Sequence, residues 1–245
     1  MRILLIGCEV LTRELADAVA NSPHPVDLRL MPKALHDLGP RAMRERLQQE
    51  IDQADPTRHD AVALGYALCG MGLAGLTARK MPLVAARAHD CIAMLLGSQE
   101  AHQKMLEDEP GTYFRSCGWV ERANDMSPLA LRQTGTGLTL AELIGKYGED
   151  NGFYLYQEFT RYQQHYSRLV FIENGLEQGT GTKERASAEA AQKGWKFEAV
   201  PGELGFFRRL ASGDWNAKEF LVLEPGETIE ACLDEQVIRA SVRTT

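Results

Sequence analysis

The sequence predicts an α/β protein with a mainly parallel, Rossmann-like sheet flanked by helices, arranged as two lobes that face one cleft. Three observations predict this fold. Short and almost wholly apolar runs recur along the chain, as is typical of strands buried on both faces. Stretches with one apolar helical face separate most of these runs. The same alternation resumes after residue 167, which predicts further parallel strands with right-handed crossovers.

The first series of elements lies in residues 1–123, which we expect to form an N-terminal α/β lobe. Its apolar runs predict four strands, and the segments around them predict helices. The expected strands are Arg2–Gly7, Val26–Met31, Ala61–Tyr66 and Pro82–Ala86, and the expected helices are Glu9–Ala20, Pro40–Asp52, a short helix over Leu73–Lys80, and Ile92–Glu107 with an interruption at Gly97-Ser98. Residues 113–120 fit either a strand or an irregular loop.

Residues 124–166 form the expected connecting segment, with helices in its second half. Residues 124–139 are poor in apolar periodicity, so we expect a connection or a mobile segment there. Two helices are expected next, over Leu140–Tyr147 and Asn151–Tyr166. Aromatic residues at helical spacing in the second helix favour a buried face. They are Phe153, Tyr154, Tyr156, Phe159, Tyr162 and Tyr166.

The second series lies in residues 167–245, the expected C-terminal α/β lobe. Its strands and helices alternate as they do in parallel sheets. The expected strands are Arg168–Glu173, Trp195–Val200 and Glu219–Leu223, and the expected helices are Lys183–Gln192 and Glu203–Ala211. This pattern fits both an extension of the first sheet and a separate sheet.

The charge of the chain limits its partners. The 245 residues include 34 Asp and Glu against 27 Lys and Arg, a net charge of −7. This charge disfavours binding to nucleic acid or anionic lipid. No apolar run approaches the roughly 20 residues that span a bilayer, and the first residues lack the features of an export signal. We therefore expect no nucleic-acid and no membrane partner, and a cytoplasmic protein with reduced thiols.

Three cysteines follow predicted strands. Cys8, Cys69 and Cys91 come after the first, third and fourth strands, and ligands of open parallel sheets bind at the carboxyl ends of the strands. Three thiolates would bind zinc, with His89 or water as fourth ligand, or a four-iron cluster with one iron open to substrate. The alternative is that all three are small buried hydrophobic residues. Cys117 and Cys232 are expected to be structural.

Other polar residues lie near the same predicted edge. His89 alternates with Cys91, so an extended backbone would point both side chains the same way, and His89 becomes a further ligand or a general acid or base. Asp90 would orient a histidine or cap the following helix. Glu9 after the first strand is the third candidate catalytic residue. His36 follows the second strand and is a candidate for cofactor binding.

The loop after the third strand also matches a dinucleotide fingerprint. Gly70, Gly72 and Gly75 satisfy G-x-G-x-x-G, and Asp90 follows about twenty residues on. The helix expected after this loop is too short for the usual dinucleotide-binding unit. We therefore expect these glycines to bring backbone amides close to an anion or a metal-linked substrate. A nicotinamide cofactor stays open as a third possibility.

Several segments resemble the uncharacterised family catalogued as domain of unknown function 1638. They are Gly7-Cys8-Glu9, Leu35-His36, Leu64–Leu76, Arg87–Ser98, Gly111–Trp119, Lys146-Tyr147-Gly148, Phe171–Gly175 and Gly213-Asp214-Trp215. The resemblance implies a shared site at Cys8, Cys69 and His89-Asp90-Cys91, and it does not require Cys117. It also implies an association with corrinoid-dependent methyl transfer.

Together these observations predict a metal-dependent cytoplasmic enzyme that acts on a small molecule at a three-cysteine site. The expected cofactor is a 4Fe-4S cluster or zinc held by Cys8, Cys69 and Cys91. The expected chemistry is Lewis-acid activation or sulfur removal or transfer. The alternative is a non-catalytic accessory or metal carrier for a corrinoid protein or methyltransferase. The third possibility is a nicotinamide-dependent oxidoreductase.

Overall fold

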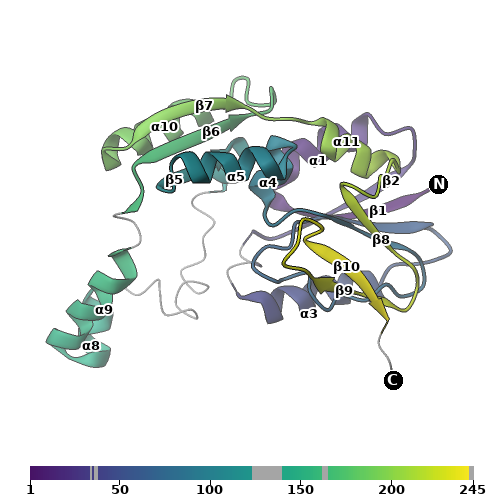
Figure 1. The fold of residues 1–245 in the computed structure, drawn as a ribbon, viewed down its shortest axis with the longest axis horizontal. Helices are drawn as coiled ribbons and strands as arrows, with labels where there is room; N and C mark the ends of the chain where they lie inside the picture. The colour runs from purple at the N-terminus through teal and green to yellow at the C-terminus, as the bar shows by residue number, and fades with distance from the viewer. Residues whose placement is uncertain (34, 36–37, 123–139, 162–164, 243–245) are drawn as a thin grey trace.

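The computed structural model describes the chain except residues 34, 36–37, 123–139, 162–164 and 243–245 (Figure 1). The described part is an α/β fold with a mixed five-stranded sheet, a parallel three-stranded sheet and a two-stranded hairpin. His36 and the segment at 124–139 therefore lie outside the described residues. No helix in the described part is long and apolar enough to cross a bilayer.

The first sheet contains the N-terminal strands. Its order is β2 (Val26–Met31), β1 (Ile3–Cys8), β3 (Ala61–Gly65), β4 (Leu83–Ala86) and β8 (Phe220–Leu223). The first four are parallel, whereas β8 pairs antiparallel with β4. β3 and β4 are buried at every position, because both lie inside the sheet and both of its faces are covered.

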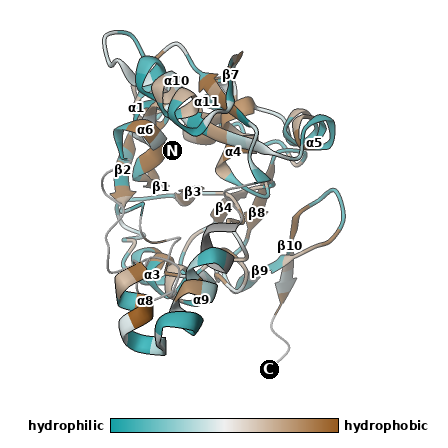
Figure 2. Ribbon diagram, turned by 90° about the vertical axis from the view of Figure 1, so that its left-hand side faces the viewer, coloured by the Kyte–Doolittle hydropathy of each residue, from teal (hydrophilic) through white to brown (hydrophobic). Residues whose placement is uncertain are grey.

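Helices cover both faces of the first sheet, as Figure 2 shows with the sheet seen almost edge-on. On one face, α3 (Pro40–Asp52) packs Met43, Leu47 and Ile51 into a core that includes the hairpin β9 (Glu227–Ala231) and β10 (Ile238–Val242). On the other face, α1 (Thr12–Ala20) and α11 (Gly205–Ser212) contribute to a second core.

The second sheet consists of β5 (Thr112–Ser116), β6 (Arg168–Glu173) and β7 (Lys196–Pro201), all parallel. On one face, Leu169 and Phe171 pack against α10 (Thr182–Lys193). On the other face, Val170 and Ile172 belong to the same core as α1 and α11. The two sheets thus share one hydrophobic core.

Short helices connect the two sheets around this shared core. A 3₁₀ turn at Glu9–Leu11 follows β1, and α4 (Cys91–Leu96) and α5 (Gln99–Asp108) follow β4. Gly97 has a φ of 67° and ends α4, and the Ser98 side chain caps α5, so the expected interruption is confirmed. Residues 112–121 divide into β5 and α6 (Cys117–Glu121).

The helices α8 (Leu140–Tyr147) and α9 (Glu149–Arg161) pack against each other and project from the rest of the molecule (Figure 1). The expectation that the aromatic residues of the second helix are buried is wrong for Phe153, Tyr154 and Tyr156, which are exposed. Tyr166 instead packs edge-on against Tyr113 of β5. The side chain of Phe159 and all of Tyr162 lie outside the described residues.

The segment between β3 and β4 also differs from expectation. Residues 66–82 contain turns and no helix, with one isolated bridge from Thr77 to Thr228. The apolar residues Leu73 and Leu76 are still buried, in the core beneath α3. Their burial explains the apolar pattern that suggests a helix.

The C-terminal strands differ from expectation in direction and in number. The predicted strand Glu219–Leu223 corresponds to β8, but it runs antiparallel to its neighbour and not parallel. The hairpin of β9 and β10 has no counterpart among the predicted elements. Strand β8 nevertheless joins the first sheet, so the C-terminal part of the chain contributes to both sheets.

Candidate functional site

A cavity of about 400 Å³ opens at the carboxyl ends of β1 and β3. The first sheet and its loops form one wall of the cavity, and residues 112–115 of β5 form part of another. Apolar side chains dominate the lining, and they come from Val10, Leu11, Ala67, Ile92, Phe114 and Trp119. This volume is in the range of small-molecule sites in proteins.

Cys8, Cys69 and Cys91 all line this cavity. Cys8 is the last residue of β1, Cys69 lies in the loop after β3, and Cys91 is the first residue of α4. All three are free thiols. They come from three separate segments of the sequence, and the parallel strands β1, β3 and β4 bring them together because these strands end at the same edge.

The three thiols influence one another's ionisation. Burial raises the pKa of Cys8 to about 11 and that of Cys69 to about 12. Burial also raises the pKa of Cys91 well above its ordinary value. Negative charge on Cys8 raises the pKa of Cys69, and negative charge on Cys69 raises the pKa of Cys91. All three are therefore neutral thiols near pH 7, and a positive ion among them would reverse this preference.

The loop that carries Cys69 is strained. Cys69 and Met71 have positive φ angles of 44° and 78°, and Gly70 between them has a φ of 61°. Left-handed backbone costs a non-glycine residue roughly 1 to 2 kcal/mol. Such strain is retained where the surrounding structure enforces it, and it is concentrated at functional sites. The strained turn directs Cys69 and Gly70 to the cavity, and both line it.

Each of the three sulfurs has hydrogen-bond donors nearby. The Tyr66 hydroxyl and the backbone N–H of Val10 lower the pKa of Cys8, because they stabilise its charged form. The backbone N–H groups of Ala67 and Cys91 do the same for Cys69. The indole N–H of Trp119 does so for Cys91. The sequence alone does not reveal these donors, although Tyr66 directly follows β3 and Trp119 lies in the Cys117-Gly118-Trp119 run.

The described residues do not form a site for a single metal ion. Among them, no group of three or more His, Cys, Asp or Glu side chains could hold a metal ion. A zinc–sulfur bond is about 2.3 Å long, so three zinc ligands must nearly touch. A cluster of several iron atoms is larger and binds thiolates that are farther apart.

His89 is exposed and is not among the residues that line the cavity. Asp90 between His89 and Cys91 has an extended backbone, and Cys91 begins α4. Asp90 caps this helix, and its carboxylate accepts hydrogen bonds from the backbone N–H groups of Ile92 and Ala93. The capping role expected for Asp90 is confirmed.

A second histidine, which the sequence pattern does not point to, lies close to the Asp90 carboxylate. His102 of α5 is buried, and its Nδ1 lies 3.5 Å from the Asp90 carboxylate. Burial lowers the pKa of His102. Its ring also contacts Phe114, which lines the cavity. Asp90 thus connects this buried histidine to the cavity wall.

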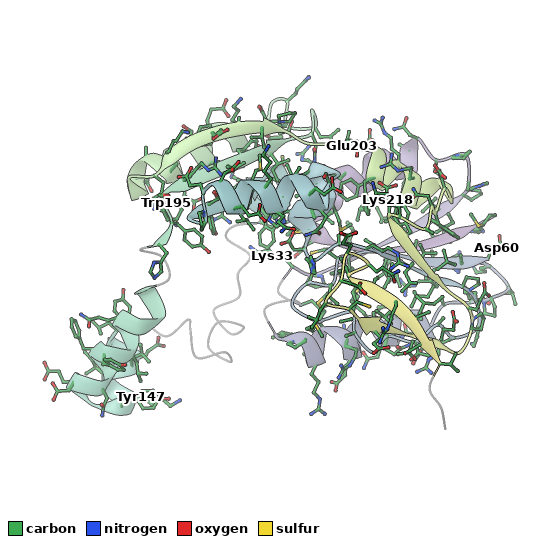
Figure 3. All side chains as sticks on the ribbon, in the orientation of Figure 1. Lys33, Asp60, Tyr147, Trp195, Glu203 and Lys218 are labelled. Carbon is green, nitrogen blue, oxygen red and sulfur yellow. The ribbon has the colours of Figure 1, made fainter. Side chains whose placement is uncertain are left out.

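Two cationic side chains border the cavity. Lys33 is buried, its Nζ donates to the carbonyl of Arg122 at 2.8 Å, and it lies 5.3 Å from the ring centre of Trp119. Figure 3 shows Lys33 at the junction between the first sheet and the layer of β5 to β7. Arg115 of β5 makes two hydrogen bonds to Glu189 and lies above the Tyr113 ring.

The other predicted residues lie around the cavity rather than in it. The Glu9 carboxylate accepts a 2.6 Å hydrogen bond from the backbone N–H of Lys33, so it fixes the chain after β2. Gly72 and Gly75 do not line the cavity. Gly72 packs on Met43, and a Cβ atom at Gly72 would collide with the Met43 sulfur.

The remaining two cysteines are not among the residues that line the cavity. Cys117 is buried at the start of α6, where the Thr182 hydroxyl donates to its sulfur at 3.5 Å. Cys232 lies beyond β9, and its sulfur is 3.9 Å from the carbonyl of Glu230. These positions agree with structural roles.

Comparison with known protein families matches residues 30–211 to DUF1638, described as a protein of unknown function. The match includes Cys69 and Cys91, whereas Cys8 precedes it. No curated protein and no solved structure gave a match. Because the matched segment covers well over half of the chain, this protein belongs to the DUF1638 family.

Proposed function

We propose that this protein is an enzyme that acts on a small molecule at an iron–sulfur cluster held by Cys8, Cys69 and Cys91. The observation that carries the proposal is that three cysteines from three strand ends line one cavity.

A cluster suits this site better than a single zinc ion. The three thiols line a cavity of about 400 Å³, whereas no group of three or more His, Cys, Asp or Glu side chains among the described residues could hold a single metal ion. Three cysteine ligands leave one iron of a four-iron cluster without a protein ligand, and that iron can bind a substrate heteroatom as a Lewis acid. Zinc on the same cysteines is the second candidate, and it requires the three loops to move closer together.

The apolar lining supports chemistry on a small substrate sheltered from bulk water. Two reactions fit an open Lewis-acid position. One is activation of a bound carbonyl or hydroxyl group. The other is hydrolytic sulfur removal, in which water adds to a thiocarbonyl carbon, the carbon–sulfur bond breaks, and the products are a carbonyl compound and hydrogen sulfide.

The accessory or metal-carrier role for a corrinoid methyltransferase system is the alternative. A carrier must present its metal to a partner at an exposed face. Here the cysteines line a cavity with aromatic walls, which favours the enzyme. An interaction with a corrinoid protein or a methyltransferase is compatible with either role.

The nicotinamide hypothesis receives less support. A dinucleotide fingerprint uses the N-terminus of the helix after the glycine loop to bind the pyrophosphate. Residues 66–82 contain no helix. The Asp90 carboxylate, expected at the ribose, is already engaged with Ile92 and Ala93.

The proposal includes the finer arrangement expected from the sequence. We take the two sheets as two Rossmann-like lobes on either side of the cavity, with residues 1–123 and 167–245 forming most of each and residues 124–166 connecting them. We also propose that the protein works in the cytoplasm, where its thiols stay reduced.

Anaerobic purification followed by metal analysis and absorption spectroscopy tests the proposal. We expect about four irons and four sulfides per chain for a complete cluster, with broad absorption in the visible range. Stoichiometric zinc would instead support the second candidate. A wild-type protein that takes up neither metal, even after reconstitution with iron and sulfide, would refute the three-cysteine site.

A further inference from the structure

Strand β5 presents its edge to the cavity, and not one of its faces. Thr112, Tyr113, Phe114 and Arg115 all line the cavity. Successive side chains of a strand point to opposite faces of its sheet, so four consecutive residues meet one cavity when it runs along the edge of the strand. β5 is the outer strand of its sheet, and among the described strands it pairs with β6 alone. The cavity therefore runs along the free edge of β5.

The register of β5 and β6 shows which main-chain groups point to this free edge. Thr112 is paired with Arg168, and the N–H of Arg168 donates to the carbonyl oxygen of Gly111 at 3.2 Å. Bonds to a single neighbour involve alternate residues of a strand, so Gly111 and Tyr113 direct their N–H and C=O groups to β6. The N–H and C=O groups of Thr112 and Phe114 consequently point away from β6.

These four groups are available for pairing. No hydrogen bond from the described part of the chain reaches the main-chain N–H or C=O group of Thr112 or Phe114. Thr112 is only 4% exposed, and Phe114 is partly buried. Main-chain polar groups in folded proteins are almost always paired, and a free strand edge is a template for pairing with another chain. At β5 this template lies on a cavity wall, where a bound molecule can reach it.

The complement of such an edge is a molecule with amide groups. Two residues that face each other in an antiparallel pair exchange two N–H···O=C bonds. A ligand residue with an amide on each side can pair with Phe114 in the same way, as an added strand does. The volume of about 400 Å³ suits a small molecule, and the side chains of Ile92 and Trp119 on the cavity wall favour apolar substituents.

We propose that the cavity binds a small, extended, peptide-like molecule with an apolar side chain, through the main-chain N–H and C=O groups on the free edge of β5. An N-acylated amino-acid amide has this chemistry. The inference concerns binding and rests on the geometry of β5. It therefore goes beyond the proposed function and does not require a metal at the cysteines.

The probes that test the proposal are the N-acetyl methylamides of leucine and valine. The matched control for each probe is its ester analogue, in which an oxygen atom replaces the N–H group of the amino acid. Each compound is titrated into the ¹⁵N-labelled full chain. Two-dimensional NMR gives the affinity and the hydrogen-exchange rate of individual main-chain N–H groups.

We expect the ester analogues to bind about tenfold more weakly than the amides, because each loses one hydrogen bond. Exchange of the Phe114 N–H should slow about tenfold when roughly nine-tenths of the protein is bound. Exchange of the Tyr113 N–H should not change, because this group is already paired with β6. No binding of either amide, equal affinity of amide and ester, or equal slowing at Tyr113 and Phe114 would overturn the proposal.

A pair of variants tests the same edge from the side of the protein. Phe114→Pro removes the N–H group, which an edge strand tolerates where that group points away from its neighbour. Phe114→Leu keeps the N–H group and controls for the loss of the ring. We expect the amide probes to bind about tenfold more weakly to Phe114→Pro than to Phe114→Leu. Equal affinity in the two folded variants contradicts the proposal.

Two further outcomes are distinguishable. If near-ultraviolet circular dichroism shows that Phe114→Pro does not fold, the comparison of amide and ester in the wild type decides. If the Phe114 N–H becomes protected as the protein concentration rises without a probe, the edge pairs with a second copy of the chain, and the proposal is wrong. Failure of the proposed function appears elsewhere, as a wild-type protein that takes up no metal.

Discussion

The backbone N–H of Cys69 donates a 2.9 Å hydrogen bond to the carbonyl oxygen of His89. A parallel bond runs from the N–H of Leu68 to the carbonyl of Ala88, also at 2.9 Å. These two bonds continue the pairing of β3 and β4 beyond the strands themselves. They fix the distance between the loops of Cys69 and Cys91. His89 thus contributes its main-chain carbonyl to the position of these loops.

The cysteines divide into two groups that mutagenesis can separate. Serine substitution of Cys8, Cys69 or Cys91 is expected to abolish stoichiometric metal binding, because each removes one thiolate ligand from the cavity. Cys232→Ser is the matched control, since Cys232 lies outside the cavity lining. Metal analysis after anaerobic reconstitution measures the effect. Equal metal loss in Cys232→Ser would show that the ligand assignment is wrong.

Metal binding is expected to release protons. The pKa values of Cys8 and Cys69 are raised to about 11 and about 12, and that of Cys91 is also raised, so the free protein holds all three protons near pH 7. Loading three thiolates should release about three protons per metal centre, and affinity should rise steeply with pH. Zinc serves as a redox-inert probe, with proton release followed in calorimetry in buffers of different ionisation enthalpy. Release of one proton or none would contradict this ligand set.

The burial of Glu14 in α1 predicts that the unfolding free energy depends on pH, independently of the cysteines. It is 1% exposed, its Oε1 accepts from the Asn174 amide at 3.2 Å, and its Oε2 has no partner within the described structure. Burial raises its pKa, assisted by negative charge on Glu177 and opposed by Arg13. The folded state therefore binds this proton more tightly than the unfolded state does. The stabilisation is complete below the unfolded pKa and is lost as pH rises through the folded one.

Glu14→Gln removes this titration and keeps the shape of the side chain. We expect the variant to exceed the wild type in unfolding free energy at pH 8 by about 1 kcal/mol, and the advantage to vanish near pH 4. Urea denaturation at both pH values measures the difference. Glu184→Gln in the first turn of α10, an exposed glutamate away from this pair, is the control. A variant advantage that is the same at both pH values would contradict the assignment.

The left-handed backbone at Met71 is expected to be strained, and substitution by glycine should relieve that strain. It has a φ of 78° and is 49% exposed, and it does not line the cavity. Met71→Gly relieves roughly 1 to 2 kcal/mol of left-handed backbone cost and adds roughly 0.5 to 1 kcal/mol of unfolded-state entropy. The variant should be more stable by about 0.5 to 1 kcal/mol, with unchanged metal content. A loss of stability in urea would refute the strain at this turn.

Gly118 is expected to tolerate no side chain. A Cβ atom there would collide with the carbonyl oxygen of Val10. Gly118→Ala should therefore destabilise the fold by about 1 to 3 kcal/mol. Gly145→Ala on α8 is the opposite case, because nothing described lies within 4 Å of its added Cβ, and it should stabilise by about 0.5 to 1 kcal/mol. Thermal melting of both variants distinguishes steric exclusion from general helix propensity.

The strands were predictable because their signal is local. The runs at Val26–Met31 and Arg168–Glu173 match β2 and β6 at both ends. A short apolar run between two turns buries its side chains most readily as a strand. The direction of β8 was not accessible in this way, since its apolar pattern is the same whether it pairs parallel or antiparallel with β4.

Two errors arose from packing that sequence periodicity does not encode. Leu73 and Leu76 have helical spacing, but they are buried from consecutive turns beneath α3. The aromatic residues of α9 also have helical spacing, yet Phe153 and Tyr154 are exposed. Periodicity shows which residues share a face, and only the tertiary structure shows whether that face is covered.

The sequence was sufficient to predict that the three cysteines come together, but not which residues surround them. Cys8, Cys69 and Cys91 follow strands, so the topology of a parallel sheet was sufficient to group them. The position of His89 depended on where α4 begins, because the capping residue Asp90 ends the extended backbone before Cys91. Tyr66 and Trp119 also line the cavity, and their positions there depend on the tertiary structure.

Strand β5 closes the cavity from a sheet whose other two strands come much later in the chain. Among the described strands it lies at an edge and pairs with β6, which begins at Arg168. During synthesis, the three cysteines leave the ribosome well before the strand that secures this wall. The nascent cavity is therefore open on one side until the chain has been extended through β6.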